Sequence, residues 1–368
     1  MRPIVLVHQP VDGGVGRHVA DLARGLTERG HEVVLCGPAA PDALPALPDG
    51  ASHVRMELDR AISPRADLAA VGSLAALVRR LAPAVVHAHS SKAGAVARLG
   101  HSLQPRVPVL YTPHGYAFAG FFSSAAQRRA YREIERLLAP LATRVVCVCA
   151  AEARLAATVG PRRRVRVVHN GVEPAGEGPI DPRMRALGER GPVVCALTQL
   201  RAGKGIETLI DATPALLARH PRAQVAIWGD GPELASLRAR ACTAGVAHAV
   251  HFPGSCEHPP AVLRGVEVFV HPSLAEAFPY VILEAMAASR AIAASDVGGI
   301  GEALGGGECG VLLPPGDARS LANAVNGLLE DPSRRAQLGA AAQRRIRQRF
   351  SRAAMLDRLM DVYSEVSD

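Results

Sequence analysis

Short apolar runs alternate with longer amphipathic stretches along most of the chain, and this alternation constrains the fold more than any other feature. In the first half, runs rich in β-branched residues predict strands at 4–8, 32–36, 85–88, 108–111, 145–149 and 165–168. Apolar residues at helical spacing predict helices between them, for example at 15–29, 68–81, 125–138 and 151–158. Strands that alternate with helices in this way are typical of a parallel sheet with helices on both faces.

The alternation stops between Asn170 and Gly191, where glycine, proline and charged residues prevail, and it then resumes. Strands are predicted at 193–197, 225–228, 268–270 and 291–294, and helices at 206–219, 233–244, 281–288 and 320–330. The remainder, 334–366, is helical with a break at Phe350–Ser351, where Ser351 can cap a new helix. We therefore expect two doubly wound Rossmann-like α/β domains, 1–170 and 192–350, a linker over 171–191, and a final helix over 351–368.

Composition excludes several other classes of protein. The apolar fraction of 48% indicates a globular chain, and no apolar run reaches the length of about 18 residues that a membrane span needs. The first apolar run is too short for a signal peptide, so a cytoplasmic protein is expected. The seven cysteines are scattered, without the spacing of a disulfide framework or a zinc site, so no metal is expected.

The net charge of +8 favours an anionic partner: a nucleotide diphosphate, a phospholipid surface or nucleic acid. Aromatic residues make up only 4% of the chain and are not interleaved with arginine, so base stacking has little support and no nucleic-acid partner is expected.

Two glycine-containing loops follow predicted strands. The first, Asp12–Arg17, leads into a helix whose N-terminus favours an anion, but Val19 and Cys36-Gly37 lack the third glycine and the acidic residue of a dinucleotide site. A purely structural turn remains open there. In the second loop, Arg201 and Lys204 flank Gly203 at a helix start, which suits a diphosphate, although a solvated helix start explains it equally well.

The segment 272–286 carries two glutamates of special interest. Glu276 precedes a helix that Pro279 helps to start, and Glu284 lies inside that helix within an apolar run. An unpaired buried carboxylate is costly, and the two hydroxyls of a ribose can satisfy one. Two solvated glutamates on an exposed face are the structural alternative. A hydrolase pair fits poorly, because both carboxylates belong to one short segment and not to opposite sides of a bond.

Glu276 and Glu284 with seven residues between them, Pro272-Ser273 and Phe278-Pro279 resemble the donor-site motif of the family-four retaining glycosyltransferases, which have the GT-B fold. The resemblance covers nearly the whole chain. It includes Gly13-Gly14, His114-Gly115, Asn170-Gly171-Val172, Gly203-Lys204-Gly205, Gly229-Asp230-Gly231-Pro232-Glu233, Gly298-Gly299 and Gly310-Val311-Leu312-Leu313-Pro314.

The resemblance implies a hexosyltransferase in which the second domain binds a nucleotide-diphosphate sugar and the first binds the acceptor, the reaction taking place in the cleft between them. Glu284 would bind the donor ribose, Glu276 the sugar hydroxyls and Lys204 the diphosphate. Catalytic roles would fall to His114 and Glu276, and the last helix would cross back onto the first domain. Transfer would retain the anomeric configuration without a metal or other cofactor.

The remaining donor-site residues implied by the resemblance are Gly14, which would allow close approach of acceptor or phosphate, and Arg201, Ala277 and Phe278. Two positions depart from the family pattern. Gln199 stands where arginine is usual, so Arg201 is expected to supply that charge, and Ala277 stands where glycine is usual.

The segments 86–94 and 111–118 resemble bacterial surface-polysaccharide transferases of that family, which implies an acceptor that is a glycan, a lipid-linked glycan or a small-molecule glycoside precursor. A nucleotide-sugar epimerase of similar architecture and a non-catalytic sugar-nucleotide binder are the alternatives. His87 and His89 share one strand face like a metal pair, but a hydrogen-bonded structural role is favoured because no third ligand is evident.

A membrane partner is the last hypothesis. Phe121-Phe122, followed by Arg128, Arg129, Arg132 and Arg136, can lie on anionic lipid at the inner face of the cell membrane. The competing expectation is that Tyr131, Ile134, Leu137 and Leu138 turn this helix into the core.

Overall fold

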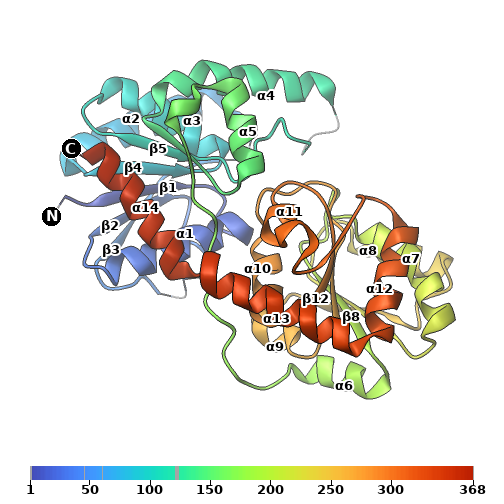
Figure 1. Cartoon of the computed structure of the whole chain (residues 1–368). Helices are drawn as coiled ribbons and strands as arrows, with labels where there is room; N and C mark the ends of the chain where they lie inside the picture. The colour runs from blue at the N-terminus through green and yellow to red at the C-terminus, as the bar shows by residue number, and fades with distance from the viewer. Residues whose placement is uncertain (1, 45, 60, 121–123, 368) are drawn as a thin grey trace. The chain divides into compact units, whose positions relative to one another are not determined.

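A computed structural model describes residues 2–44, 46–59, 61–120 and 124–367. The chain forms two compact units (Figure 1). Unit 1 contains residues 1–170 together with 352–368, and unit 2 contains residues 171–351. Among the described residues, no helix is both long and apolar enough to cross a membrane.

Unit 1 is built on a seven-stranded parallel sheet with the order β3-β2-β1-β4-β5-β6-β7. Its strands are β1 (Ile4–His8), β2 (Val33–Gly37), β3 (Ala51–Arg55), β4 (Val85–His89), β5 (Val109–Thr112), β6 (Arg144–Cys147) and β7 (Val165–Val167). Its helices are α1 (Gly13–Thr27), α2 (Pro64–Leu81), α3 (Ser91–Leu103), α4 (Ala125–Leu138), α5 (Ala150–Val159) and α14 (Arg352–Ser367). Alternate residues of β1 explain the two layers: Leu6 packs with α1 and α14 on one face, and Val5 with α2 and α3 on the other.

Unit 2 repeats this architecture with a six-stranded parallel sheet in the order β10-β9-β8-β11-β12-β13. Its strands are β8 (Val193–Leu197), β9 (Gln224–Trp228), β10 (Val250–Gly254), β11 (Val268–His271), β12 (Ala291–Ser295) and β13 (Val311–Leu313). Its helices are α6 (Pro182–Arg190), α7 (Ile206–Arg219), α8 (Leu234–Thr243), α9 (Pro259–Leu263), α10 (Tyr280–Ala287), α11 (Ile300–Ala303), α12 (Ala318–Glu330) and α13 (Pro332–Arg349).

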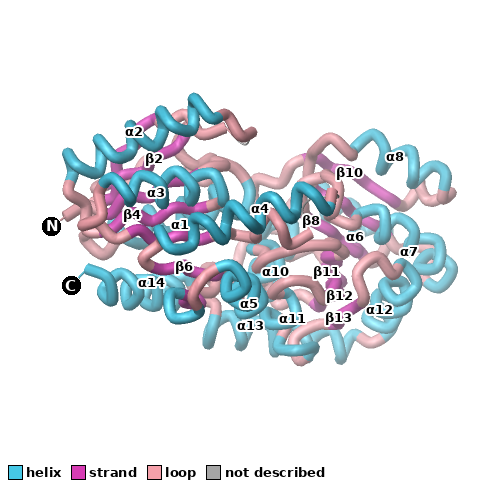
Figure 2. Tube along the Cα trace, turned by 90° about the horizontal axis from the view of Figure 1, so that it is seen from above, coloured by secondary structure: helices cyan, strands magenta, loops and turns pink. Residues whose placement is uncertain are grey.

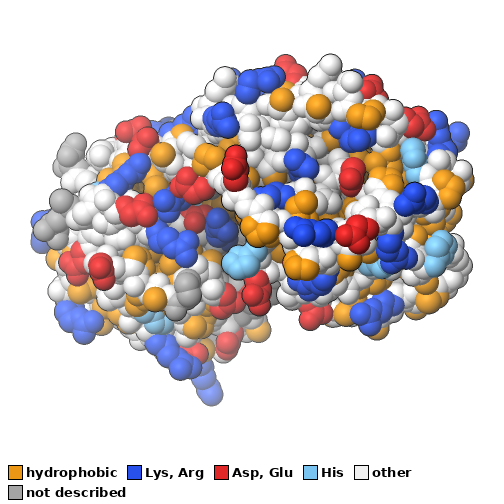
Figure 3. All heavy atoms as spheres, turned by 90° about the horizontal axis from the view of Figure 1, so that it is seen from below, with side chains coloured by type: hydrophobic (Ala, Val, Ile, Leu, Met, Phe, Trp, Pro, Cys, Tyr) orange, Lys and Arg blue, Asp and Glu red, His pale blue; other side chains and the backbone are white. Residues whose placement is uncertain are grey.

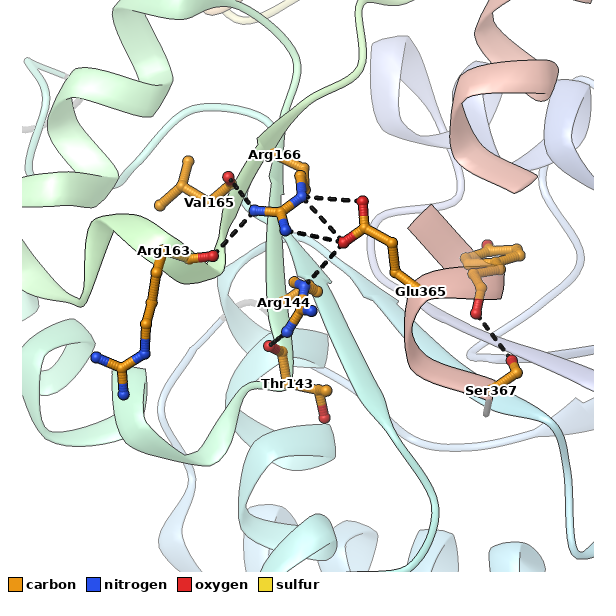
Figure 4. Close-up of polar contacts among 8 residues, drawn as sticks. Thr143, Arg144, Arg163, Val165, Arg166, Glu365 and Ser367 are labelled. Carbon is orange, nitrogen blue, oxygen red and sulfur yellow. Dashed lines mark hydrogen bonds and ion pairs between the residues drawn. The ribbon is translucent and has the colours of Figure 1, made fainter. Parts of the chain in front are cut away.

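The last helix, α14, belongs to unit 1 although the chain reaches it from unit 2. Leu356 and Leu359 are almost fully buried in the core formed with α1. Near the end of α14, the Glu365 carboxylate lies 3.3 Å from Arg144 and 2.9 Å from Arg166, which come from β6 and β7 (Figure 4). Apolar burial and ion pairs together therefore hold this distant segment on unit 1.

The prediction of two doubly wound domains is confirmed, but three strands were missed for physical reasons. β3 is a half-exposed edge strand without an apolar run, β10 contains Pro253 and Gly254, and β13 has only three residues. The break before α14 falls at Phe350–Ser351 as expected. The segment 171–191, expected to be an irregular linker, contains α6, whose Met184 is fully buried against Trp228.

Two further expectations were wrong. Ile134 and Leu137 of α4 do not pack into the core, since 37% and 76% of their surfaces are exposed, whereas Leu138 is buried. Cys149 does not continue β6 beside Cys147 but caps the start of α5, where its Sγ accepts a hydrogen bond from the Glu152 amide. Phe121 and Phe122, the apolar half of the membrane hypothesis, lie outside the described residues.

The strand order fixes where each unit can hold a ligand. In unit 1 the direction of winding reverses between β1 and β4, and in unit 2 it reverses between β8 and β11. Loops that leave the carboxyl ends of such neighbouring strands turn to opposite faces and leave a crevice, the usual ligand site of open α/β sheets. The loops after β8 and β11 carry Lys204 and Glu276, and the segment after β5 carries His114.

Candidate active site

The loops that follow β8 and β11 are joined backbone to backbone. The Leu274 amide donates a hydrogen bond of 2.9 Å to the Gly203 carbonyl. Gly205 has a φ of +64°, and a Cβ at this position would lie 2.0 Å from the Pro272 carbonyl oxygen. Only glycine therefore allows this approach, which brings the Arg201–Gly205 turn against the start of the glutamate-containing segment.

This contact places Lys204 beside Glu276. The Lys204 Nζ lies 2.6 Å from Glu276 Oε1, and the side chains are only 14% and 10% exposed. His271, the last residue of β11, brings its Nε2 within 3.1 Å of the same oxygen. Burial alone would raise the pKa of Glu276, but Lys204 and His271 outweigh it and hold that pKa well below its usual value. Glu276 is therefore an ionised carboxylate in a largely dry site.

A third loop, after β12, packs against the backbone of the segment that carries Glu276. The Gly299 amide donates a 2.7 Å hydrogen bond to the Ala277 carbonyl. Gly298 has a φ of +58°, and a Cβ there would lie 2.0 Å from the Glu276 carbonyl oxygen. The Phe278 ring is buried, with its centroid 5.3 Å from that of Phe350, so this side chain anchors the loop in the core of unit 2.

Helix α10 begins at Tyr280, directly after Pro279, and therefore places Glu276 in the preceding loop and Glu284 inside the helix, as predicted. Glu284 is half-buried. The pKa of Cys256, in the loop after β10, is raised to about 11 by burial and, to a smaller extent, by the charge of Glu284. Glu284 thus lies near that loop.

Arg201 and Gln199 are both exposed on the turn after β8.

In unit 1, His114 lies in the turn after β5 with a φ of +55°. Its Nε2 lies 3.1 Å from Nδ1 of His89, the last residue of β4, and its ring centroid is 4.6 Å from that of His18 on α1. His87 instead makes 2.8 Å hydrogen bonds to Tyr363 and Thr112, so the predicted structural role is confirmed for His87.

For His89 the expectation that no third ligand lies nearby was wrong. Ring nitrogens of His18, His89 and His114 all lie within 4.8 Å of one another. Neutral imidazoles at this spacing could share a transition-metal ion. Burial lowers the pKa of all three, that of His18 to about 4, so each ring is neutral at pH 7.

Contacts of Gly115 hold the His114 turn, and close packing of Gly16 holds the first glycine loop. The Gly115 amide donates a 2.5 Å hydrogen bond to Glu152, a buried residue of α5 whose pKa burial raises to about 7. Gly14 is exposed in the first turn of α1. Gly16 packs so tightly against Val11 that a Cβ would lie 1.9 Å from its carbonyl oxygen.

Two family models match the two halves of the chain. Residues 13–171 match the model described as "Glycosyl transferase 4-like domain", and residues 180–345 match the model described as "Glycosyl transferases group 1". Both models describe glycosyltransferases and together they match most of the chain, so the chain is a glycosyltransferase with a 4-like first domain and a group 1 second domain. It is an enzyme of the GT-B fold, as the resemblance of its motifs implied.

Relatives of this glycosyltransferase extend over nearly its whole length. It is 29% identical to a glycogen synthase of Mycobacterium tuberculosis, with 92% of this chain and 86% of the relative covered. It is also 29% identical to a phosphatidyl-myo-inositol mannosyltransferase of Mycolicibacterium smegmatis, with 97% and 91% covered. The solved structure of Anabaena HepE in complex with UDP-glucose superimposes with a TM-score of 0.82 at 22% identity and covers 99% of both chains.

The two candidate sites, one in each unit of the glycosyltransferase, contain residues that the sequence did not single out. His271 contacts Glu276, and His18 joins His89 and His114. His271 stands at a strand end directly before Pro272-Ser273, a position that could have drawn attention to it. His18 carries no such signal, because it lies six residues after Asp12 inside α1 and only the packing of that helix brings it to His114.

The Lys204–Glu276 pair predicts that the stability lost on replacing Lys204 depends on pH. Lys204→Met should lower the free energy of unfolding at pH 7.5 by on the order of 3 kcal/mol, because it leaves a buried carboxylate without its ammonium partner. The loss should be smaller at pH 4.5, where Glu276 of the variant can take up a proton. Urea denaturation at both pH values measures this. Arg240→Met, which removes an exposed ion pair with Asp211, should change little, and an equal loss at both pH values would contradict the prediction.

The buried histidines predict that unit 1 loses stability in mild acid. Because the pKa of His18 is lowered to about 4 in the folded chain, the unfolded chain binds more protons below pH 6.5, and stability falls as the pH drops from about 6.5 to 4. The slope should be about 1.4 kcal/mol per pH unit for each such histidine. His18→Gln should reduce the slope measured by urea denaturation, whereas His258→Gln, on an exposed loop of unit 2, should keep it. An unchanged slope in His18→Gln would show that His18 does not contribute.

Proposed function

We propose that this glycosyltransferase takes its sugar from a nucleotide-diphosphate donor bound by unit 2 and transfers it with retention of configuration. The observation that carries the proposal is the buried cluster of Lys204, Glu276 and His271 at the carboxyl ends of β8 and β11. An ammonium and an ionised carboxylate held together in a dry crevice suit a ligand that presents both phosphate charge and sugar hydroxyls.

Each side chain would then have one task. Lys204 would exchange part of its contact with Glu276 for the diphosphate oxygens, which are the leaving group, and the exposed Arg201 on the same turn would add a second positive charge. Glu276, kept ionised by its neighbours, would accept hydrogen bonds from the sugar hydroxyls. Glu284, on α10 near the loop after β10, would accept the ribose hydroxyls.

Relatives support the donor assignment. HepE of Anabaena has been solved with UDP-glucose, and its fold matches that of this chain over nearly the whole length. One relative is named a glycogen synthase and another a phosphatidyl-myo-inositol mannosyltransferase, so the first name points to a glycan product and the second to a lipid acceptor. The acceptor would thus be a glycan, a lipid-linked glycan or a glycoside precursor bound by unit 1. We expect no metal to be needed, since Lys204 and Arg201 would neutralise the leaving diphosphate.

His114 is the catalytic candidate that unit 1 provides. Its pKa lies well below the usual value because the ring is desolvated, so it is a neutral imidazole whose nitrogen can accept or donate a hydrogen bond to a sugar hydroxyl. The contact with His89 fixes the ring position. The alternative of an epimerase, which would act on the donor alone, draws no support from the family models.

Peripheral membrane contact and a cytoplasmic location remain predictions. Helix α4 exposes Arg129, Arg132 and Arg136 together with Leu137, although Arg136 forms a 2.8 Å ion pair with Glu133. On the face drawn in Figure 3, basic side chains are interspersed with acidic ones and do not form one continuous patch. Because Arg136 of α4 is already paired with Glu133, membrane contact of this helix would depend on apolar side chains as well as on charge.

The test is a panel of UDP-, GDP-, ADP- and dTDP-sugars, incubated with and without acceptors and followed by mass spectrometry. Lys204→Ala and Glu284→Ala should each lower kcat/KM by about 100-fold or more, because each removes a contact to the departing nucleotide. Arg240→Met serves as the folded control with unchanged activity. Full activity in either site variant would refute its role, an altered sugar formed from donor alone would indicate an epimerase, and binding without turnover would indicate a binder.

A further inference from the structure

A cavity of about 670 Å³ lies in unit 1, between helices α2, α3 and α4 and the carboxyl ends of β1, β4 and β5. The three helices lie next to one another along the sheet (Figure 2). The volume falls in the range of about 300–1,000 Å³ that is typical of small-molecule sites.

The outer part of this cavity is unusually apolar for a surface. Nine large hydrophobic side chains are exposed among the described residues, and five of them line the cavity: Ile62, Leu68, Leu99, Ile134 and Leu137. Leu68 of α2 and Leu137 of α4 are 72% and 76% exposed, so the fold of unit 1 gains little from them. A cluster of this kind marks a binding surface, whereas single exposed leucines are ordinary.

The inner part of the same cavity is polar and contains the catalytic candidate. His114, Gly115 and Ser90 line it where β4 and β5 end. Beside them, the Lys92 ammonium lies 2.6 Å from the Asp67 carboxylate, and the Lys92 side chain is only 9% exposed. A molecule that fills the cavity would therefore present a polar group to His114 and an apolar remainder to α2, α3 and α4.

Buried ionic contacts hold the walls in place. Arg98 of α3 and Glu135 of α4 are both almost fully buried and lie 2.8 Å apart. Tyr111 donates a 2.9 Å hydrogen bond to the same carboxylate, and the Arg98 guanidinium lies 4.0 Å from the centre of its ring. These buried contacts fix α3 against α4. The exposed apolar side chains of the two helices therefore line a groove that exists before any ligand binds.

We propose that this cavity binds the hydrocarbon chain of the acceptor, so that the substrate of the glycosyltransferase is a sugar carried on a lipid. The inference rests on the proposed function and selects one of its three acceptor classes. A glycan without a chain would leave the five apolar side chains uncovered, whereas a chain-bearing sugar covers them and brings its hydroxyl to His114. The exposed arginines Arg129 and Arg132 on α4 also suit a lipid whose sugar is attached through phosphate.

Alkyl glucosides of increasing chain length test the binding part. Methyl, hexyl, octyl and decyl β-glucoside, each below its critical micelle concentration, are titrated into the full-length protein by calorimetry. The affinity should rise about three- to fourfold for each methylene that enters the cavity, the factor that corresponds to ~0.8 kcal/mol per buried methylene. Affinity that does not depend on chain length overturns the proposal.

The variant Leu68→Gln/Leu137→Gln should lose most of this chain-length dependence while its melting temperature stays near that of the wild type, because both side chains are exposed. Leu103→Gln is the matched control, since Leu103 is 57% exposed on α3 but does not line the cavity. The same dependence in the double variant and the wild type would mean non-specific adsorption or self-association and would overturn the proposal.

Transfer assays separate this inference from the proposed function. With a donor that the enzyme turns over, octyl and decyl glycosides should have a lower KM than methyl glycosides of the same sugar, and the double variant should remove the difference. Equal KM values would overturn the inference and leave the proposed function standing. Pocket-dependent binding of alkyl glucosides without transfer from any donor to any acceptor would overturn the proposed function instead.

Discussion

Parallel strands end at the same edge of a sheet, and the central side chains of both candidate sites depend on that constraint. In unit 2 it brings the loops after β8, β11 and β12 together, so that Lys204, Glu276 and the Gly298 turn meet although they are distant in sequence. In unit 1 it brings the ends of β4 and β5 together and sets His89 against His114. Glycines at 205 and 298 permit approaches that any side chain would prevent.

The buried ionisable side chains of the two candidate sites have opposite charge states: Lys204 and Glu276 of unit 2 are charged and the histidines of unit 1 are neutral. Unit 2 keeps a carboxylate ionised in a nearly dry site by placing an ammonium and an imidazole against it. Unit 1 keeps its histidines neutral through burial, which lowers their pKa values. The charged site suits a ligand with phosphates and the neutral one suits hydroxyls, which agrees with a division between donor and acceptor.

The apolar cavity of unit 1 connects the neutral site to the surface. Its walls come from three helices that also cover the sheet, and the Arg98–Glu135 contact lets α3 and α4 serve both purposes. The leucines that line its outer part add little to the stability of the fold, so their presence is better explained by a ligand than by packing. An amphiphilic acceptor would satisfy both ends of the cavity.

The sequence by itself determined the two parallel α/β units, the positions of most strands and helices, and the family, because apolar periodicity and the spacing of Glu276 and Glu284 are local properties of the chain. It could not determine that His271 contacts Glu276, that His18 joins His89 and His114, or that Ile134 and Leu137 stay exposed. These depend on which loops and helices meet across the sheet. Only the tertiary structure decides such contacts, since residues far apart in sequence become neighbours through strand order and helix packing.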